Sequence, residues 1–303
     1  MNNFEGYAHP DYIFSLSEFG EPLNLPRSGS WLLKRQIPGS PYWDAMGPYP
    51  LFFCHRWSQL QRDLEELGDD LVSISLVTDP FGEYIPMDLH RCFQDVVIPF
   101  KEHFIADLRR PLNEIVGKSN RQKARRALKK LKVNICLNPM ELLEEWTDLY
   151  DHLIRRHNIT GIRAFSKKAF AKQLSIPGSV ALHASYDNVM VGAALYFRQD
   201  DVVHCHLGAA NEIGYELGAF YAIDFSSIAY FSNKVRYLNL GGGAGLVNDN
   251  DGVSLYKRGW STETRITYFC GRINSPARYA EIIKNRGIAP NGYFPAYRKG
   301  EFG

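Results

Sequence analysis

Residues 180–207 read VALHASYDNVMVGAALYFRQDDVVHCHL, and this segment decides the fold class. Apolar, strand-like runs occupy residues 180–186, 189–197 and 202–207. Two short segments separate the runs, Asp187-Asn188 and residues 199–201 (QDD), and Asp and Asn favour tight turns. Strand-like runs joined by such short turns predict a meander of three antiparallel strands.

Strands and helices mix on both sides of the meander. Strands are predicted over residues 30–37, 71–77, 103–108, 132–137, 236–240 and 265–269, and helices over residues 56–67, 111–131, 139–158, 167–174, 218–231 and 276–285. Residues 71–77 (LVSISLV) alternate with Ser and should be half buried, whereas residues 38–50, with their Gly and Pro, should form a loop. This mixture predicts an α/β protein, α+β in detail, with mixed sheets and helices packed on them.

The chain of 303 residues has the composition of an ordinary globular protein, with 45% hydrophobic and 22% charged residues. These fractions exclude disorder, collagen and a coiled coil as descriptions of the whole chain. The length predicts about two domains or one large one. A net charge of +2 is too small to require nucleic acid or an anionic membrane, and we expect no DNA partner.

The sequence contains no pattern of a secreted, membrane-spanning or metal-binding protein. Its five cysteines form no C-x-x-C pair, no apolar run reaches 18 residues, and the N-terminus lacks a secretory signal. His204 and His206 should share one face of a strand, but no third ligand lies nearby in the sequence, so a metal site is disfavoured. An α/β-hydrolase is disfavoured too, because no G-x-S-x-G occurs. We therefore expect a cytoplasmic protein without a bound metal.

Residues 118–132 (KSNRQKARRALKKLK) contain eight basic residues and no acidic one. Helical spacing places five of them on one face: Lys118, Arg121, Arg125, Lys129 and Lys132. The other face carries Ala124, Ala127, Leu128 and Leu131. The segment predicts either a solvated helix face or a binding surface for RNA or a phosphorylated ligand, since phosphate contacts need only clustered cations.

Residues 239–245 (NLGGGAG) lead from a predicted strand into consecutive glycines. Neither a P-loop nor a dinucleotide-binding fingerprint fits this run. The run predicts either a plain turn or the backbone wall of a substrate site, formed by Asn239, Gly241, Gly242 and Gly243. Lys257 follows in residues 255–260 (LYKRGW), either as a surface cation or as a group that neutralises an oxyanion or a phosphate.

Residues 239–260 as a whole resemble the C-terminal signature of FemAB-like transferases, which belong to the GNAT-fold acyltransferases. Residues 120–127 (NRQKARRA) are similar to a basic helix of that family, and residues 209–219 to its central strand–helix junction. Residues 293–298 (YFPAYR) are similar to a closing segment of some members. The order and spacing of these segments, rather than any single motif, carry the resemblance.

The resemblance implies two GNAT-like domains packed side by side with a cleft between them. We expect an N-terminal domain over residues 1–131, a transferase domain over residues 132–275, and a tail over residues 276–303 that packs back on the first domain. In the peptidoglycan-bridge members, an aminoacyl group passes from aminoacyl-tRNA to an amine of a cell-wall precursor. By position in the family's pattern, Lys257 is implied as a catalytic residue and Asp107 as an acceptor-side residue. We expect Lys257, helped by backbone N–H groups of the glycine run, to stabilise the oxyanion, and Asp107 to orient or deprotonate the amine.

The donor has two alternatives. The segment that would cradle an acyl-CoA pyrophosphate in GNAT enzymes matches residues 211–216 (NEIGYE), whose two Glu side chains would repel phosphate. We therefore expect aminoacyl-tRNA as the donor, a small or nucleotide-linked amine as the acceptor, and no permanently bound cofactor. Arg163, His206 and Tyr215 are expected to line the substrate channel. A CoA-dependent N-acyltransferase acting on a sugar nucleotide or amino acid, and a non-catalytic RNA- or nucleotide-binding module, are the alternatives.

Overall fold

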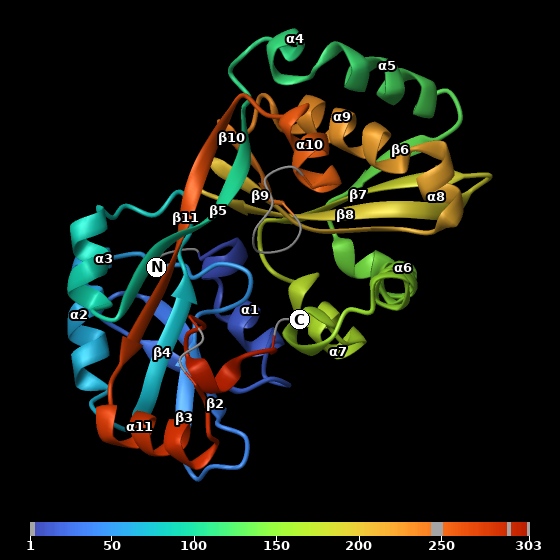
Figure 1. The fold of residues 1–303 in the computed structure, drawn as a ribbon. Helices are drawn as coiled ribbons and strands as arrows, with labels where there is room; N and C mark the ends of the chain where they lie inside the picture. The colour runs from blue at the N-terminus through green and yellow to red at the C-terminus, as the bar shows by residue number, and fades with distance from the viewer. Residues whose placement is uncertain (1–3, 244–250, 290–291, 302–303) are drawn as a thin grey trace. The chain divides into compact units, whose positions relative to one another are not determined.

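The computed structural model describes residues 4–243, 251–289 and 292–301. The chain forms two compact units that interleave along the sequence (Figure 1). Unit 1 contains residues 1–9, 101–159 and 164–265, and unit 2 contains residues 10–100, 160–163 and 266–303. The contiguous division at residues 131 and 275 differs from these units and stays a prediction.

Unit 1 is built on a mixed sheet with the strand order β5-β10-β9-β8-β7-β6. Its strands are β6 (Lys132–Cys136), β7 (Ser179–Tyr186), β8 (Val189–Gln199), β9 (Val202–Ala210), β10 (Tyr237–Gly242) and the second half of β5 (Val96–Asp107). The expected meander is confirmed, since β7, β8 and β9 pair antiparallel in succession. Its turns use positive φ angles at Asp187, Asn188 and Asp200. β10 then adds parallel to β9 and antiparallel to β5.

Helices cover both faces of this sheet (Figure 1). They are α4 (Leu112–Ile115), α5 (Lys118–Ala127), α6 (Leu143–His157), α7 (Lys167–Gln173), α8 (Glu212–Leu217), α9 (Ala219–Phe231) and α10 (Gly252–Arg258), with 3-10 turns at Gly6–Ala8 and Pro139–Leu142. On one face, α5 and α9 bury Ala124 and Ile223 in a core that also takes Val203 of β9. On the other face, α6 packs on β9, and its Trp146 ring contacts Phe170 of α7.

Unit 2 has the strand order β1-β2-β3-β4-β11. Its elements are β1 (Glu21–Leu25), β2 (Ser30–Gln36), β3 (Trp43–Met46), β4 (Leu71–Val77), β11 (Glu263–Ile273), α1 (Pro10–Ser15), α2 (Trp57–Glu66), α3 (Pro86–Cys92) and α11 (Pro276–Asn285), with 3-10 turns at Gly161–Arg163 and Ala296–Arg298. Leu60 and Leu64 of α2 bury themselves against Ile74 of β4. The predicted mixture of sheets and helices, and hence the α/β fold class, is confirmed in both units.

Two expectations for unit 2 are wrong. The segment 38–50, expected to be a loop, contains β3, which pairs parallel with β4. β4 is buried almost throughout rather than half buried. The reason is that both of its faces are covered, since Ile74 packs in the α2 core while Val72 packs with Tyr297 and Ile282 from the C-terminal segment.

The single helix expected over residues 111–131 is also wrong. The chain is extended at Gly117, whose amide donates to the Gly259 carbonyl oxygen, and this break separates α4 from α5. α5 ends at Ala127, so Lys129 lies beyond the helix and Lys132 begins β6. A contact with a residue far along the chain therefore breaks a segment that its local composition favours as a helix.

Candidate active site around Lys257

The candidate site lies where β10 separates from β9. The parallel pairing of these strands ends at Asn239 opposite His204, although β9 continues to Ala210 and β10 to Gly242. The chain then turns at Gly241, whose φ of +78° suits glycine. Asn239 holds this turn, because its Oδ1 accepts a hydrogen bond from the Gly241 amide at 2.8 Å.

Lys257 reaches the turn from α10. The helix begins after Asp251, whose Oδ1 accepts hydrogen bonds from two amides of the first turn. Lys257 Nζ donates to the Gly242 carbonyl oxygen at 2.6 Å. A Cβ atom added at Gly241 would lie 3.3 Å from Nζ, so a side chain there would crowd the ammonium. Gly243 belongs to the same turn and accepts from Lys101 Nζ at 3.4 Å, while Ala244 and Gly245 lie outside the described residues.

Of the two charges in this region, Asp224 is buried and Lys257 is half-buried. Burial lowers the pKa of Lys257, and the negative charge of Asp224 opposes the fall. Burial raises the pKa of Asp224 to about 6, although the Tyr256 hydroxyl, which donates to Oδ2 at 2.6 Å, and the Lys257 charge oppose the rise. Lys257 and Asp224 are thus each held by a hydrogen bond to a neutral group.

Three buried histidines lie on the strands next to β10, His103 on β5 and His204 and His206 on β9. Asn239 bridges two of them, with Oδ1 at 3.1 Å from His103 Nδ1 and Nδ2 at 3.1 Å from His204 Nδ1. His206 Nδ1 lies 2.9 Å from the Tyr7 hydroxyl, and the Tyr7 ring contacts both His204 and His206. The two β9 histidines therefore share a face, as predicted. Burial lowers the pKa of each histidine to about 3, so all three are neutral at pH 7.

The structure brings together Lys257, Asn239 and the glycine turn, but it does not bring Asp107 to them. Asp107 pairs with Tyr237 at the start of β10, whereas His103 pairs with Gly242 at its end. Four residues along a strand span about 13 Å. The Asp107 carboxylate instead accepts from the Arg109 amide at 3.1 Å and lies 3.6 Å from Arg236 Nη2.

Two further predicted channel residues lie on other elements. Tyr215 is on α8, 38% exposed, with its ring 4.4 Å from the guanidinium of Arg156. Arg163 belongs to unit 2. Among the predicted channel residues, His206 is the one that lies on β9, which borders the site, and its ring nitrogens contact Tyr7 and Gln173.

Sequence reasoning missed His103 and Asp224. A signal for Asp224 exists, because it is the single charged residue in the otherwise apolar helix α9 (AFYAIDFSSIAYF). His103, Ile105 and Asp107 share one face of the strand, so the sequence pattern alone does not distinguish His103 from Asp107. The register between β5 and β10 decides between them.

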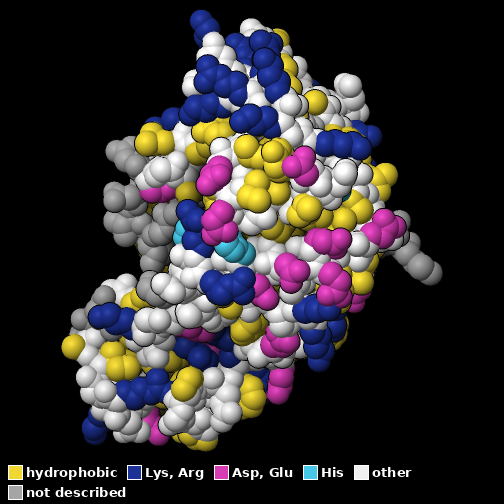
Figure 2. Space-filling model, turned by 90° about the vertical axis from the view of Figure 1, so that its right-hand side faces the viewer, with side chains coloured by type: hydrophobic (Ala, Val, Ile, Leu, Met, Phe, Trp, Pro, Cys, Tyr) yellow, Lys and Arg dark blue, Asp and Glu magenta, His cyan; other side chains and the backbone are white. Residues whose placement is uncertain are grey.

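The basic segment forms a charged surface on unit 1. Figure 2 shows Lys and Arg side chains gathered at the top of the view, over α5. Exposed members of this surface are Lys118, Arg125, Lys129 and Lys132, with Arg121 half-buried. From the same helix, Lys123 Nζ donates to the Tyr221 hydroxyl at 3.1 Å, and the Tyr221 ring contacts that of Tyr256. The basic surface is thus linked through two aromatic rings to the helix that carries Lys257.

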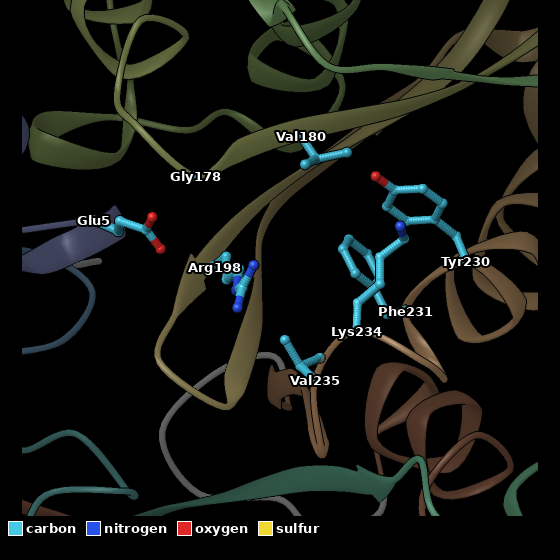
Figure 3. Close-up of a pocket in the computed structure, with 8 residues that line it drawn as sticks. All are labelled: Glu5, Gly178, Val180, Arg198, Tyr230, Phe231, Lys234 and Val235. Atoms are coloured by element: carbon cyan, nitrogen blue, oxygen red, sulfur yellow. The ribbon is translucent and has the colours of Figure 1, made fainter. Parts of the chain in front are cut away.

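A pocket of about 330 Å³ opens elsewhere on unit 1 (Figure 3). Val180, Phe231 and Val235 form its apolar floor, and Arg198 and Lys234 bring cations to its rim. Lys234 Nζ lies 4.7 Å from the centre of the Tyr230 ring. The pocket shares no residue with the Lys257 site, so it adds nothing to that chemistry.

The described residues contain no group of three or more His, Cys, Asp or Glu side chains placed to hold a metal ion. In the same part of the chain, no helix has both the length and the apolar character needed to cross a membrane.

No protein-family model and no curated protein matches the chain. Several solved structures, in contrast, match the chain in fold. FemX aligns with a TM-score of 0.60 at 12% identity, over 84% of this chain and 86% of its own. The C-terminal domain of a putative lysylphosphatidylglycerol synthetase from Agrobacterium fabrum aligns with a TM-score of 0.61 at 11% identity, over 91% of both chains. L-PGS from Bacillus licheniformis aligns with a TM-score of 0.59 at 14% identity, over 94% of this chain and 98% of its own.

These likenesses extend over most of each chain. At this level of identity they establish a shared fold, and they confirm at that level the FemAB-like resemblance expected from the sequence. Function has to be argued from the site.

Proposed function

We propose that the protein is an acyltransferase that moves an aminoacyl group from an activated ester to an amine. The observation that carries this proposal is the ammonium of Lys257, which is half-buried and held against the glycine turn by the Gly242 carbonyl oxygen. One of its protons is used in that hydrogen bond, and two remain to stabilise the oxyanion of a tetrahedral intermediate. One such donor lowers the barrier by about 3–4 kcal/mol. The fold shared with FemX and a putative lysylphosphatidylglycerol synthetase supports aminoacyl transfer.

Aminoacyl-tRNA is the donor we propose. The basic surface around Arg121 and Arg125 offers the clustered cations that a tRNA backbone requires. The tyrosines Tyr221 and Tyr256 link that surface to α10, so RNA bound there would lie on elements packed against the Lys257 helix. The acceptor would be an amine of a small molecule or a cell-envelope precursor, and a tRNA donor implies a cytoplasmic reaction.

Acyl-CoA is the weaker donor candidate. In the segment that would cradle its pyrophosphate, the Gly214 amide is already bonded to Asn211 Oδ1 at 2.9 Å. Glu212 Oε1 at the start of the same helix lies 2.9 Å from His152 Nε2 and keeps negative charge beside the remaining amides. Both features disfavour a bound diphosphate.

The test is transfer of a labelled amino acid from charged tRNA to a panel of amines. Lys257→Met should lower turnover at least ~100-fold, because it removes the oxyanion donor while keeping the apolar stem. Lys284→Met, at an exposed lysine of α11, is the matched control and should leave turnover unchanged. Near-normal turnover in Lys257→Met with an unchanged melting temperature would refute the role of Lys257.

Binding experiments separate the alternatives. Salt-dependent binding that prefers charged over uncharged tRNA supports the proposal. Tight binding of acetyl-CoA favours the CoA-dependent enzyme instead. RNA binding without transfer to any amine favours a non-catalytic module.

A further inference from the structure

His103 occupies a place that the proposed chemistry leaves unassigned. It lies on β5, pairs across the strands with Gly242, and is 7% exposed. Gly242 is the residue whose carbonyl oxygen binds Lys257 Nζ. The imidazole and the ammonium therefore approach one turn from two elements, β5 and α10.

The hydrogen bonds fix the tautomer of His103. An amide side chain is often ambiguous in orientation, but a backbone N–H only donates. The Asn239 atom that lies 2.8 Å from the Gly241 amide must therefore be the oxygen. The same oxygen lies 3.1 Å from His103 Nδ1 and only accepts, so Nδ1 carries the proton. Nε2 is left with a free lone pair.

The other end of the amide agrees with this assignment. Asn239 Nδ2 only donates, and it lies 3.1 Å from His204 Nδ1, so that nitrogen accepts. His204 is therefore protonated at Nε2, the opposite tautomer to His103. One asparagine thus sets two neighbouring imidazoles in different states, and the one opposite the glycine turn presents a base.

We propose that His103 Nε2 is the proton acceptor for the attacking amine. This inference rests on the proposed acyl transfer. The lone pair of a neutral amine forms the N–C bond, the carbonyl π electrons move to the oxygen beside Lys257, and the amine proton passes to Nε2. When the C=O bond reforms, the C–O bond to the ribose breaks, and the leaving oxygen takes the proton from Nε2. The products are an amide and a free hydroxyl, and His103 returns to its neutral state.

The surrounding charges suit this cycle. Burial, and then the positive charges of Lys257 and Lys101, lower the pKa of His103, so the resting imidazole is neutral but is a weaker base than a free histidine. An oxyanion formed beside Lys257 would offset that positive charge. The imidazolium would therefore become less costly at the step that creates it.

Kinetics with three variants test the role. His103→Gln keeps a donor for Asn239 Oδ1 but has no basic nitrogen, and it should lower kcat at least ~100-fold with little change in KM. His103→Ala should be similarly slow and should regain activity when imidazole is added. His90→Gln, at an exposed histidine of α3, is the control. Full activity of His103→Gln, or no imidazole rescue of His103→Ala, would overturn the inference while leaving the proposed transferase intact.

A second measurement does not depend on turnover. Nitrogen-15 chemical shifts of the histidine rings at pH 7 should show His103 protonated at Nδ1 and His204 protonated at Nε2. Protonation of His103 at Nε2 would overturn the inference whatever the activity. A wild-type protein that transfers no aminoacyl group from any charged tRNA would instead refute the proposed function, and the catalytic role of His103 with it.

Discussion

Both units bury charge, but they neutralise it in different ways. In unit 2, Asp44 is 1% exposed and accepts from Arg298 Nε at 2.8 Å and from Nη2 at 2.9 Å. Arg35 Nε lies 3.4 Å from the same carboxylate, and Arg35 also pairs with Glu301. Each buried charge of this cluster faces an opposite one. The cluster ties the C-terminal segment to β2 and β3, which is a structural task.

In unit 1 a buried and a half-buried charge bond to neutral groups instead. Lys257 donates to a carbonyl oxygen, and Asp224 accepts from the Tyr256 hydroxyl. A charge that is bonded only to neutral groups contributes less to the free energy of unfolding than a paired charge does. The reason is that such hydrogen bonds compensate only part of the cost of removing the charge from water. Such charges remain available to a ligand or a transition state. The charges of the unit 2 cluster are thus paired with one another, whereas Lys257 and Asp224 of unit 1 would be available to the proposed chemistry.

The largest expected loss of stability follows from removing the buried carboxylate of the unit 2 cluster. Asp44→Ala removes the carboxylate shared by Arg35 and Arg298 and leaves two buried guanidinium groups without it. Removing one partner of a buried pair costs about 3–5 kcal/mol. Urea denaturation should show this loss, while the turnover of the folded fraction is retained.

The control for Asp44→Ala is a surface pair in the same unit. Glu66→Ala breaks the pair with Arg27. The side chain of Glu66 is 56% exposed and that of Arg27 is 47% exposed. An exposed pair contributes roughly 0–1 kcal/mol, so this variant should unfold almost as the wild type does. Equal losses of unfolding free energy in the two variants would show that burial does not increase the contribution of the Asp44 cluster to stability.

The sequence predicts these units unevenly. The meander is predictable because its turns lie next to the strands that they join, and Asp187-Asn188 supplies the required positive φ angles. β3 is not, because its four residues are stabilised by pairing with β4, beyond α2 in the chain. The site shows the same limit. The choice of His103 over Asp107 depends on the register between β5 and β10, which more than 100 residues of chain separate.

A smaller effect concerns the pH dependence of unit 1. Burial raises the pKa of Asp224 to about 6 in the folded protein, above its value of about 3.9 in an unfolded chain. Ionising Asp224 in its buried position costs free energy in the folded protein. The stability that the protonated Asp224 allows below pH 4 is therefore lost as the pH rises through 6. The loss, compared with Asp224→Asn, should reach about 3 kcal/mol above pH 7.

Denaturation curves of wild type and Asp224→Asn from pH 4 to pH 8 measure this difference. Asp70→Asn, at an exposed aspartate, is the control and should follow the wild type across the range. A constant difference between wild type and Asp224→Asn over these pH values would contradict a raised pKa. It would also weaken the contrast between the two units.

The smallest expected loss of stability follows from removing a hydrogen bond to Asp224 while its carboxylate is kept. Tyr256→Phe removes the hydroxyl that donates to Asp224 and so leaves the carboxylate with one donor fewer. A hydrogen bond to a charged group contributes about 1.5–3 kcal/mol. Since this bond lowers the pKa of Asp224, its loss should raise that pKa further, and the destabilisation should be larger at pH 8 than at pH 4.

Unit 2 contains the matched control for that variant. The Tyr42 hydroxyl donates to Glu281 Oε2 at 3.0 Å, the same pair of groups in a solvent-exposed setting. Tyr42→Phe should cost little at either pH, because water replaces the lost donor. If the two tyrosine variants lose equal stability at pH 8, the Asp224 carboxylate is as well solvated as a surface glutamate. Asp224 would then not behave as a buried charge, and the contrast between unit 1 and unit 2 would depend on Lys257 alone.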